Sequence, residues 1–198
     1  MKTSLKLVIS ALAILPGCAT PAPTPSPLAG VLDSPGPAAD RPAEAHLYDF
    51  LVGHWGLSVV GHGANGARQE SRGELHAEFV LEGRAIQDVW ITPPRGERTG
   101  APELPVTGAF YGTTLRIYDP SLKAWRIQWS DPVTQYYAQQ IGRPDGADIV
   151  QLGDMPDGSK LRWRFTEIQP DSFHWIGEMS VDGGATWTLV VEIFAKRR

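Results

Sequence analysis

The stretch GHWGLSVVGHGANGARQESRGELHAEFVLEGRAIQDVWIT, residues 53–92, contains three apolar runs of period two separated by two turns. Trp55, Leu57 and Val59 alternate with small or polar residues in the first run, and apolar residues hold every second position of 75–81 in the next. Residues 63–66 (GANG) and 82–83 (EG) separate the runs, and the third covers 84–92. Alternation places apolar side chains on one face of a strand, and Gly and Asn tolerate the positive φ of tight turns. The stretch therefore predicts three successive antiparallel strands.

The same alternation and turn chemistry continue to the C-terminus. Later turn segments, each with Pro, Asp or Gly, lie at 119–121, 144–146, 156–158, 170–172 and 182–184. The runs between them are rich in β-branched and aromatic residues, and only His46 to Val52 has helical character. Ten sequential antiparallel strands are best closed into a barrel, because closure removes the unpaired edge strands through which molecules would aggregate. We predict an all-β fold: a single antiparallel up-and-down β-barrel of about ten strands, with a short N-terminal helix.

The start and the end of this segment share features with a known barrel group. Gly53-His54-Trp55 resembles the Gly-x-Trp signature of calycins, which include the lipocalins. The resemblance implies that Trp55 plugs the closed end of the barrel and that a basic residue of the last strand stacks across it. The chain ends in Lys196-Arg197-Arg198, so such a residue is available.

Residues 47–198 as a whole resemble a family of lipocalin-like bacterial lipoprotein domains of unknown function. The resemblance rests on four short segments: 50–55 (FLVGHW), 83–84 with 88–90, 118–120 with Trp125, and 180–187. It implies a calycin-like barrel and brings no activity with it.

A separate motif marks the last predicted hairpin. Residues 180–187 (SVDGGATW) are similar to the Asp-box of sialidase propeller blades. The resemblance implies structural roles: Asp182 accepts backbone N–H bonds within the turn, Gly184 permits the bend, and Trp187 packs under the hairpin. The motif has no second copy, which argues against a propeller. Asp182 is therefore not a catalytic candidate.

The N-terminus predicts export and lipidation. Lys2 and Lys6 precede an apolar run over 7–15, which is too short to span a membrane and fits a signal peptide. Leu15-Pro16-Gly17-Cys18 resembles the lipobox of bacterial lipoproteins. We expect residues 1–17 to be a signal peptide and Cys18 to carry the lipid, including palmitate. The alternative is an ordinary signal cut near Ala19. Because Ala19 is not the Asp of the inner-membrane retention signal, we expect anchoring in the outer membrane, facing the periplasm.

Composition divides the rest of the chain and excludes some partners. Residues 18–45 comprise the acylated cysteine and a Pro-rich linker, and residues 46–198 form one domain. Without Lys2 and Lys6 the 18 basic residues fall to 16 against 22 acidic ones, a net charge of −6. Nucleic acid is therefore an unsuitable partner. Cys18 is the only cysteine, so the domain has no disulfide and no thiol chemistry.

Catalytic and cofactor motifs are absent from the sequence. It has no nucleophile elbow, P-loop, dinucleotide fingerprint or zinc-helix motif. His54 and His76 can meet across the first hairpin, but without a nearby carboxylate they make a poor metal site. Nitrobindin barrels, which are also calycin-like, bind haem through a histidine, and His174 is the corresponding candidate here. We expect no metal and no cofactor, with haem at His174 as the alternative.

Cross-strand pairing predicts a pocket inside the barrel. Pairing around Glu82-Gly83 places Phe79 opposite Ile86 and turns the even-numbered residues from 84 to 90 to the apolar face. Pairing across 119–124 groups further charged and aromatic residues on one face. The resulting candidates for ligand contacts are Arg84, Asp88, Trp90, Arg116, Tyr118 and Trp129. The alternative is an internal ion pair of Asp88 with Arg84 or Arg116 in a filled barrel.

Three functions are compatible with these features. The first is an envelope lipoprotein whose barrel binds a small, partly apolar ligand. The second is an enzyme, such as a hydrolase or isomerase, that uses Asp88 as acid or base on an apolar substrate. The third is a structural or interaction lipoprotein with a filled barrel. A cavity lined by Arg84, Asp88 and Trp90 would favour the first two, whereas a filled interior would favour the third.

Overall fold

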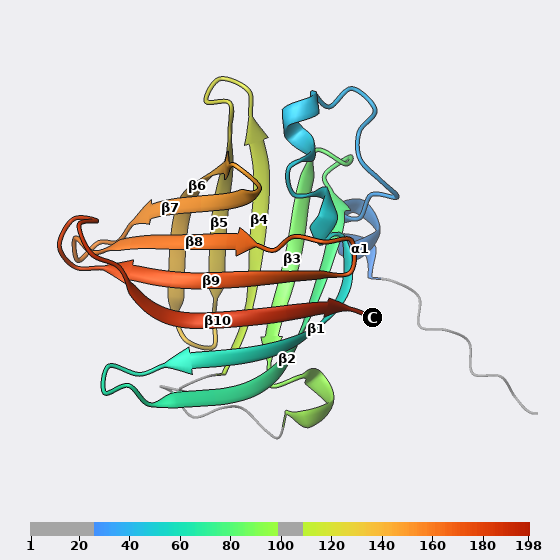
Figure 1. The fold of residues 1–198 in the computed structure, drawn as a ribbon. Coiled ribbons are helices and arrows are strands. Elements are labelled where there is room, and N and C mark those ends of the chain that lie inside the picture. Colours follow the sequence, from blue (N-terminus) through green and yellow to red (C-terminus); the bar gives the residue numbers. More distant parts are fainter. Residues whose placement is uncertain (1–25, 99–108) are drawn as a thin grey trace, which may run out of the picture.

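The computed structural model describes residues 26–98 and 109–198, and it confirms the predicted barrel. Ten antiparallel strands pair in chain order, and β10 pairs with β1 to close the sheet (Figure 1). The strands are β1 (Gly53–His62), β2 (Arg68–Val80), β3 (Ala85–Thr92), β4 (Phe110–Asp119), β5 (Ala124–Asp131), β6 (Tyr136–Asp145), β7 (Asp148–Asp154), β8 (Lys160–Thr166), β9 (Ser172–Ser180) and β10 (Thr188–Arg197).

The register of the first hairpins follows the apolar alternation. His54 pairs with His76, and Phe79 pairs with Ile86, as the turn positions predict. Since a shift of one residue would turn every apolar side chain outward, burial holds this register strongly.

One end of the barrel is closed by packed side chains. Tyr48, Leu51 and Trp55 are fully buried there, and the Tyr48 ring meets Trp125 edge-on with the ring centres 5.0 Å apart. We call this the closed end, and the end formed by the finish of β1 and the start of β2 the open end. The segment before β1 forms two 3₁₀ turns, η1 (Ala43–His46) and η2 (Asp49–Leu51), in place of the single helix predicted over 46–52. A segment this short gains little from helical hydrogen bonds. The packing of Tyr48 and Leu51 therefore decides its conformation.

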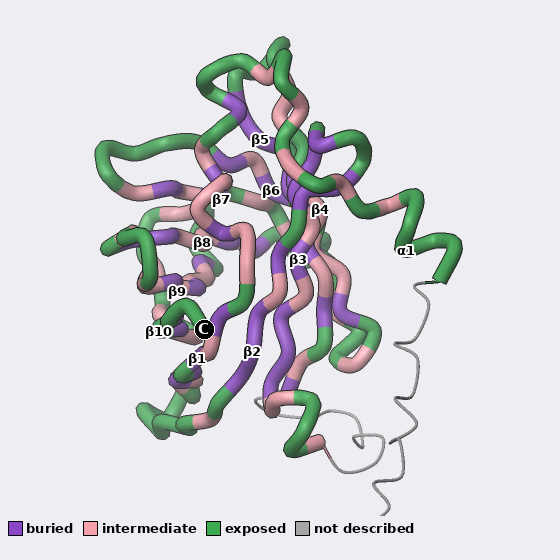
Figure 2. Tube along the Cα trace, turned by 90° about the vertical axis from the view of Figure 1, so that its right-hand side faces the viewer, coloured by how far each residue is buried: buried purple, intermediate pink, exposed green. Residues whose placement is uncertain are grey.

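Part of the predicted linker lies on the barrel. Helix α1 (Pro27–Leu32) has no buried residue (Figure 2). The segment that starts at the last residue of α1, residues 32–41, runs beside the β2–β3 turn, and we call it the strap. Backbone bonds join them: Leu81 N donates to Leu32 O, Ser34 N to Phe79 O, and Ala38 N to Gly83 O. The Pro-rich composition did not indicate this docking, because backbone groups make these contacts and they require no apolar side chains.

The predicted signal peptide over 1–17 and the predicted lipid site Cys18 lie outside the described residues. None of the helices within the described ranges has the length and apolar character needed to cross a membrane.

Candidate functional site

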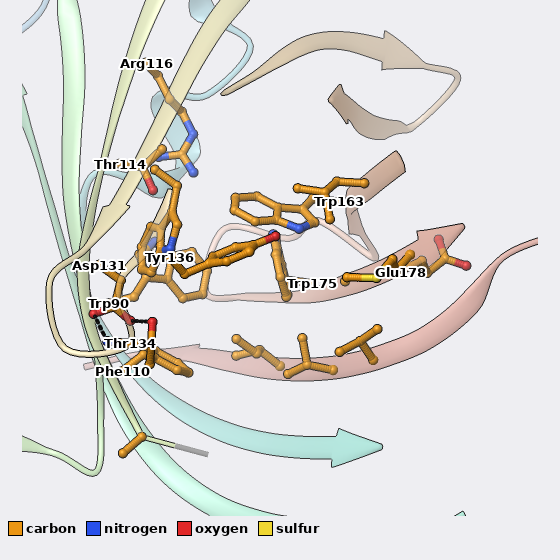
Figure 3. Close-up of a pocket in the computed structure, with 18 residues that line it drawn as sticks. Trp90, Phe110, Thr114, Arg116, Asp131, Thr134, Tyr136, Trp163, Trp175 and Glu178 are labelled. Atoms are coloured by element: carbon orange, nitrogen blue, oxygen red, sulfur yellow. Dashed lines mark hydrogen bonds between the residues drawn. The ribbon is translucent and has the colours of Figure 1, made fainter. Parts of the chain in front are cut away.

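A cavity of about 350 Å³ occupies the open half of the barrel interior (Figure 3). Strands β3 to β6 and β8 to β10 contribute to its wall. The aromatic residues that line it are Trp90, Phe110, Trp129, Tyr136, Trp163 and Trp175. The closed half is filled instead, since Trp55, Trp125 and Phe165 pack together there.

The aromatic rings form a chain of edge contacts around the cavity. Trp163 lies between Trp175 and Trp129, with ring-centre distances of 5.4 and 6.3 Å and interplanar angles of 62° and 83°. Such edge-to-face pairs hold ring orientations in addition to burying area. Two glycines make room for the rings. A Cβ on Gly112 would lie 2.3 Å from the Trp129 ring, and one on Gly177 would lie 2.9 Å from the Trp175 ring.

A charged pair lies at the inner end of the cavity. Arg116 lines the cavity, and its Nη1 donates to Oδ2 of Asp88 on the neighbouring strand β3. Both residues are 1% exposed. Asp88 Oδ1 also accepts from the backbone N–H of Thr114 at 3.1 Å. Burial raises the pKa of the Asp88 carboxyl, and this effect outweighs the opposing influence of Arg116.

The acidic groups near the cavity mouth are already bonded. Glu178 accepts from Arg162 Nε at 2.7 Å and Nη2 at 2.9 Å, and from Arg164 Nε at 3.1 Å. The hydrogen bond from Arg162 is the largest cause of the lowered Glu178 pKa. Asp131 accepts from the Thr134 hydroxyl at 2.8 Å and from the Val133 N–H at 2.8 Å. Burial raises the pKa of Tyr136 to about 12, so its hydroxyl stays protonated at neutral pH.

The structure places three of the six predicted ligand contacts on the cavity wall and three elsewhere. Trp90, Arg116 and Trp129 line the cavity. Asp88 points inward but is not among the lining residues, because it lies against Arg116. Tyr118 is not among the lining residues, which corrects its prediction as a ligand contact, because its ring packs on Trp125 at 5.9 Å, toward the closed end.

Arg84 is a correction to the prediction. Its side chain is exposed, and Nη2 donates to Oδ2 of Asp40 in the strap at 3.0 Å. The reason is that the turn covers Leu81 to Arg84, and the ladder resumes only at the pair Val80 and Ala85. Arg84 is therefore outside the alternation that turns Ile86 and Asp88 inward.

Several cavity residues were missed from the sequence. Trp163 on β8 is two residues from the buried Phe165, and Trp175 on β9 is two residues from the buried Phe173. Each Trp therefore shares the inward face of its strand, so the period of two was a usable signal. Val190 and Val191 were not recoverable in this way. A register shift between Leu189 and Val191 lets both consecutive residues reach the cavity wall.

The residues predicted to be structural have the expected geometry. Trp55 is fully buried, its Nε1 donates to Leu51 O at 2.8 Å, and the Arg197 guanidinium lies 4.0 Å from its ring centre. In the last hairpin Asp182 Oδ1 accepts from the Thr186 N–H at 2.9 Å, and Gly184 has φ +100°. Bonding to Thr186 lowers the pKa of Asp182. Trp187 is half-buried, with Arg162 over its ring at 4.2 Å.

The histidines lie away from the cavity. Nδ1 of His54 is 2.7 Å from Nδ1 of His76, as the hairpin register predicts, and His76 Nε2 is 3.1 Å from Glu74 Oε2. His174, the haem alternative, stacks on Phe194 on the outer face, with ring centres 4.3 Å apart. Within residues 26–98 and 109–198, no three His, Cys, Asp or Glu side chains form a group that could hold a metal ion.

Comparison with known proteins supports the fold. No protein-family model matches the chain, and no curated protein sequence matches it. The S-type phycobiliprotein lyase CPES from Guillardia theta has a similar structure, with a TM-score of 0.52 and 11% identity, over 80% of this chain and 94% of that chain. EF1p2_mFAP2b bound to DFHBI has a TM-score of 0.39 and 12% identity, over 79% of this chain and 100% of that chain, which is too weak a likeness to support an argument. The first likeness supports the closed antiparallel barrel fold. Membership of a lipocalin-like lipoprotein family stays a prediction.

Proposed function

We propose that this protein binds a small, largely apolar molecule in its barrel and works in the cell envelope, tethered by lipid on Cys18. The observation that carries the proposal is the aromatic-walled cavity of about 350 Å³. Ligand pockets are typically concave and mostly apolar, with a few polar groups at defined positions. The cavity of this barrel has that composition, with Arg116 at its inner end.

The aromatic wall argues against a purely structural barrel. Ring faces that border a void lack the dispersion contacts that packed neighbours would provide. A bound apolar molecule would restore those contacts, at about 25 cal/mol for each Å² of apolar surface removed from water. A barrel selected only for stability would be filled at both ends, as the closed end is.

The charged groups argue against acid–base catalysis by Asp88. A general acid or base has to come within hydrogen-bond reach of the reacting group. Asp88 is completely buried, and Arg116 and Thr114 occupy its oxygens. A ligand in the cavity would therefore meet Arg116 and not Asp88, which favours binding over catalysis.

The position of the strap is compatible with the proposed tether. The strap lies beside the β2–β3 turn, and that turn belongs to the end of the barrel that Trp55 and Tyr48 close. A chain anchored at Cys18 would thus join the barrel at its closed end. The open end of the barrel, which contains the cavity, would then lie opposite the attachment point of the tether.

The tether is tested by the variant Cys18→Ser. Because the thioether to lipid needs the thiol, we expect this variant to move from the membrane fraction to the soluble fraction or to accumulate uncleaved. The measurement is cell fractionation with mass spectrometry of the N-terminus. Cleaved Cys18→Ser protein that still partitions into membranes would contradict the proposed anchor.

Ligand binding is tested with the neutral fluorescent probe N-phenyl-1-naphthylamine. We expect the wild-type protein to bind it with a rise in fluorescence, and we expect Val191→Trp, which fills the cavity wall, to weaken binding at least tenfold. Phe194→Trp is the matched control on the same strand, because Phe194 lies on the outer face and is 45% exposed. Equal binding by both variants, or no binding by the wild type, would disprove a cavity ligand. Native mass spectrometry of protein from its own host would then identify what is bound.

A further inference from the structure

The hydrogen bonding of the Arg116 guanidinium is incomplete. Nη1 donates to Asp88, but Nε is buried and has no hydrogen-bond partner within the described ranges. The rings of Tyr48 and Phe165 lie 5.3 and 5.8 Å from the guanidinium carbon and offer their π faces. These cation–π contacts stabilise the charge but leave the Nε donor without an acceptor. A buried, unpaired donor on a charged group costs more than a neutral one, so an acceptor is required.

Because Arg116 lines the cavity, a ligand bound there can supply an acceptor. Figure 3 shows the Arg116 guanidinium directed from β4 into the space near Trp163. Asp88, by contrast, does not line the cavity, and its two carboxylate oxygens accept from Arg116 and from the Thr114 N–H. In this ion pair the Asp88 carboxylate is bonded by groups of the protein, whereas the Arg116 guanidinium keeps donors that Asp88 does not use.

The geometry of the Nε–Nη2 edge of Arg116 indicates which ligand group it can bind. The Nε–H and Nη2–H groups of arginine point the same way and match the two oxygens of a carboxylate. The same chain shows this fork elsewhere, where Arg162 binds Glu178 through Nε at 2.7 Å and Nη2 at 2.9 Å. In Arg116 the bond to Asp88 uses the other nitrogen, Nη1, and leaves this fork available.

We propose that the cavity selects ligands with an apolar, aromatic-sized body and a carboxylate at the inner end, held by the Nε–Nη2 edge of Arg116. This inference rests on the proposed ligand-binding function and specifies its ligand class. Asp88 positions the guanidinium through Nη1, and the aromatic wall takes the apolar body.

The experiment compares 2-naphthoate with its neutral isostere 2-naphthamide as competitors of bound N-phenyl-1-naphthylamine. In the wild-type protein we expect naphthoate to displace the probe at a concentration at least tenfold lower than naphthamide does. Arg116→Lys keeps the charge but loses the fork, so the preference should fall to threefold or less. Arg126→Met is the matched control, because Arg126 is an exposed arginine on β5 that bonds Asp119. It should retain the full preference.

Removing Arg116 alone would leave Asp88 buried without its partner, so the decisive variant is the double replacement Asp88→Asn with Arg116→Gln. We expect it to bind N-phenyl-1-naphthylamine within about threefold of the wild type and to lose the preference for naphthoate. A preference that survives in this variant overturns the assignment to Arg116. Wild-type protein that binds the probe but does not prefer naphthoate overturns the carboxylate inference alone. Wild-type protein that does not bind the probe overturns the proposed function itself.

Discussion

Three residues at the closed end explain the Gly-x-Trp motif in physical terms. Gly53 has φ +125°, a conformation that strains any other residue, and a Cβ there would lie 2.5 Å from Arg197 Nη1 and displace the guanidinium. Arg197 donates to the backbone carbonyls of Phe50 and Val52 and covers the ring of Trp55. The motif thus joins the first strand, the last strand and the 3₁₀ segment at one point.

Trp55→Ala is expected to cost about 3–5 kcal/mol of unfolding free energy, because it removes a fully buried ring and leaves a cavity beneath Arg197. That loss is a large fraction of a typical domain stability of about 5–15 kcal/mol. Thermal and denaturant unfolding would measure it. Phe194→Ala, at a site 45% exposed, serves as control and should cost much less. Similar losses in the two variants would contradict the plug role of Trp55.

Glu74 provides a second residue-scale test, through pH. Its side chain is 9% exposed and accepts from Arg95 Nε at 2.7 Å and from the Arg95 backbone N–H at 2.9 Å. The bond from the Arg95 side chain lowers the pKa of Glu74 from 4.5 to about 2. A carboxyl whose pKa is lower in the folded state stabilises the fold above the unfolded pKa, and this stabilisation is lost as pH falls toward the folded value.

Glu74→Gln should therefore destabilise the protein at pH 7, by on the order of 1–2 kcal/mol after allowing for solvent around the exposed Arg95. The gap between variant and wild type should shrink between pH 4.5 and pH 2, with most of the change visible by pH 3. Melting temperatures of both proteins at pH 7 and pH 3 give the comparison. A gap of constant size across this range would show that the ion pair does not contribute.

At the scale of elements, the strap and the β2–β3 turn pack in close backbone contact. Gly83 has φ +74°, and a Cβ on it would lie 2.3 Å from Gly36 O and 2.5 Å from Ala38 N. Beside this contact Arg41 bonds Asp49 at 2.7 Å and lies over the Phe79 ring. The turn therefore requires glycine for its conformation and also for the close approach of the strap.

Two glycine variants separate these requirements. Gly66, in the β1–β2 turn, has a similar φ of +77° but open space around it. Gly66→Ala should thus cost only the strain of a left-handed φ, about 1 kcal/mol. Gly83→Ala should cost more and should speed hydrogen exchange at the Ala38 amide, which donates to Gly83 O. Equal melting temperatures and unchanged exchange would indicate that the strap is not docked in solution.

For the whole molecule, closure of the sheet and filling of the barrel interior are separate properties. The pairing of β1 with β10 closes the sheet along seven residue pairs, from Trp55–Arg197 to Gly61–Val191, and leaves no free edge between the first and last strands. Aromatic and aliphatic side chains then fill the half near Trp55, whereas the half near Trp175 keeps its cavity. A stable barrel and a ligand site can therefore coexist, because packing at one end holds the walls of the other.

The sequence by itself determined the strands, their turns and their register. Alternation of apolar residues, turn chemistry and hairpin length act between near neighbours, so the pairs His54–His76 and Phe79–Ile86 follow from local rules. The closed-end contact of Trp55 with Arg197 joins the first and last strands, but the calycin resemblance and the basic C-terminus predicted it. The pairing of Asp88 with Arg116 was one of two predicted alternatives, since both residues lie inward on adjacent strands.

Only the tertiary structure decided which inward side chains meet in space and which gaps stay open. Arg84 lies outside the cavity because the turn ends one residue later than alternation alone implies, and Asp40 of the strap binds it there. Trp163 contacts Trp129 and Trp175 contacts Trp90, and the absent side chains of Gly112 and Gly177 leave room for these rings. Periodicity specifies the face of a strand on which a residue lies. The volume left inside depends on contacts between strands far apart in the chain, which no local pattern encodes.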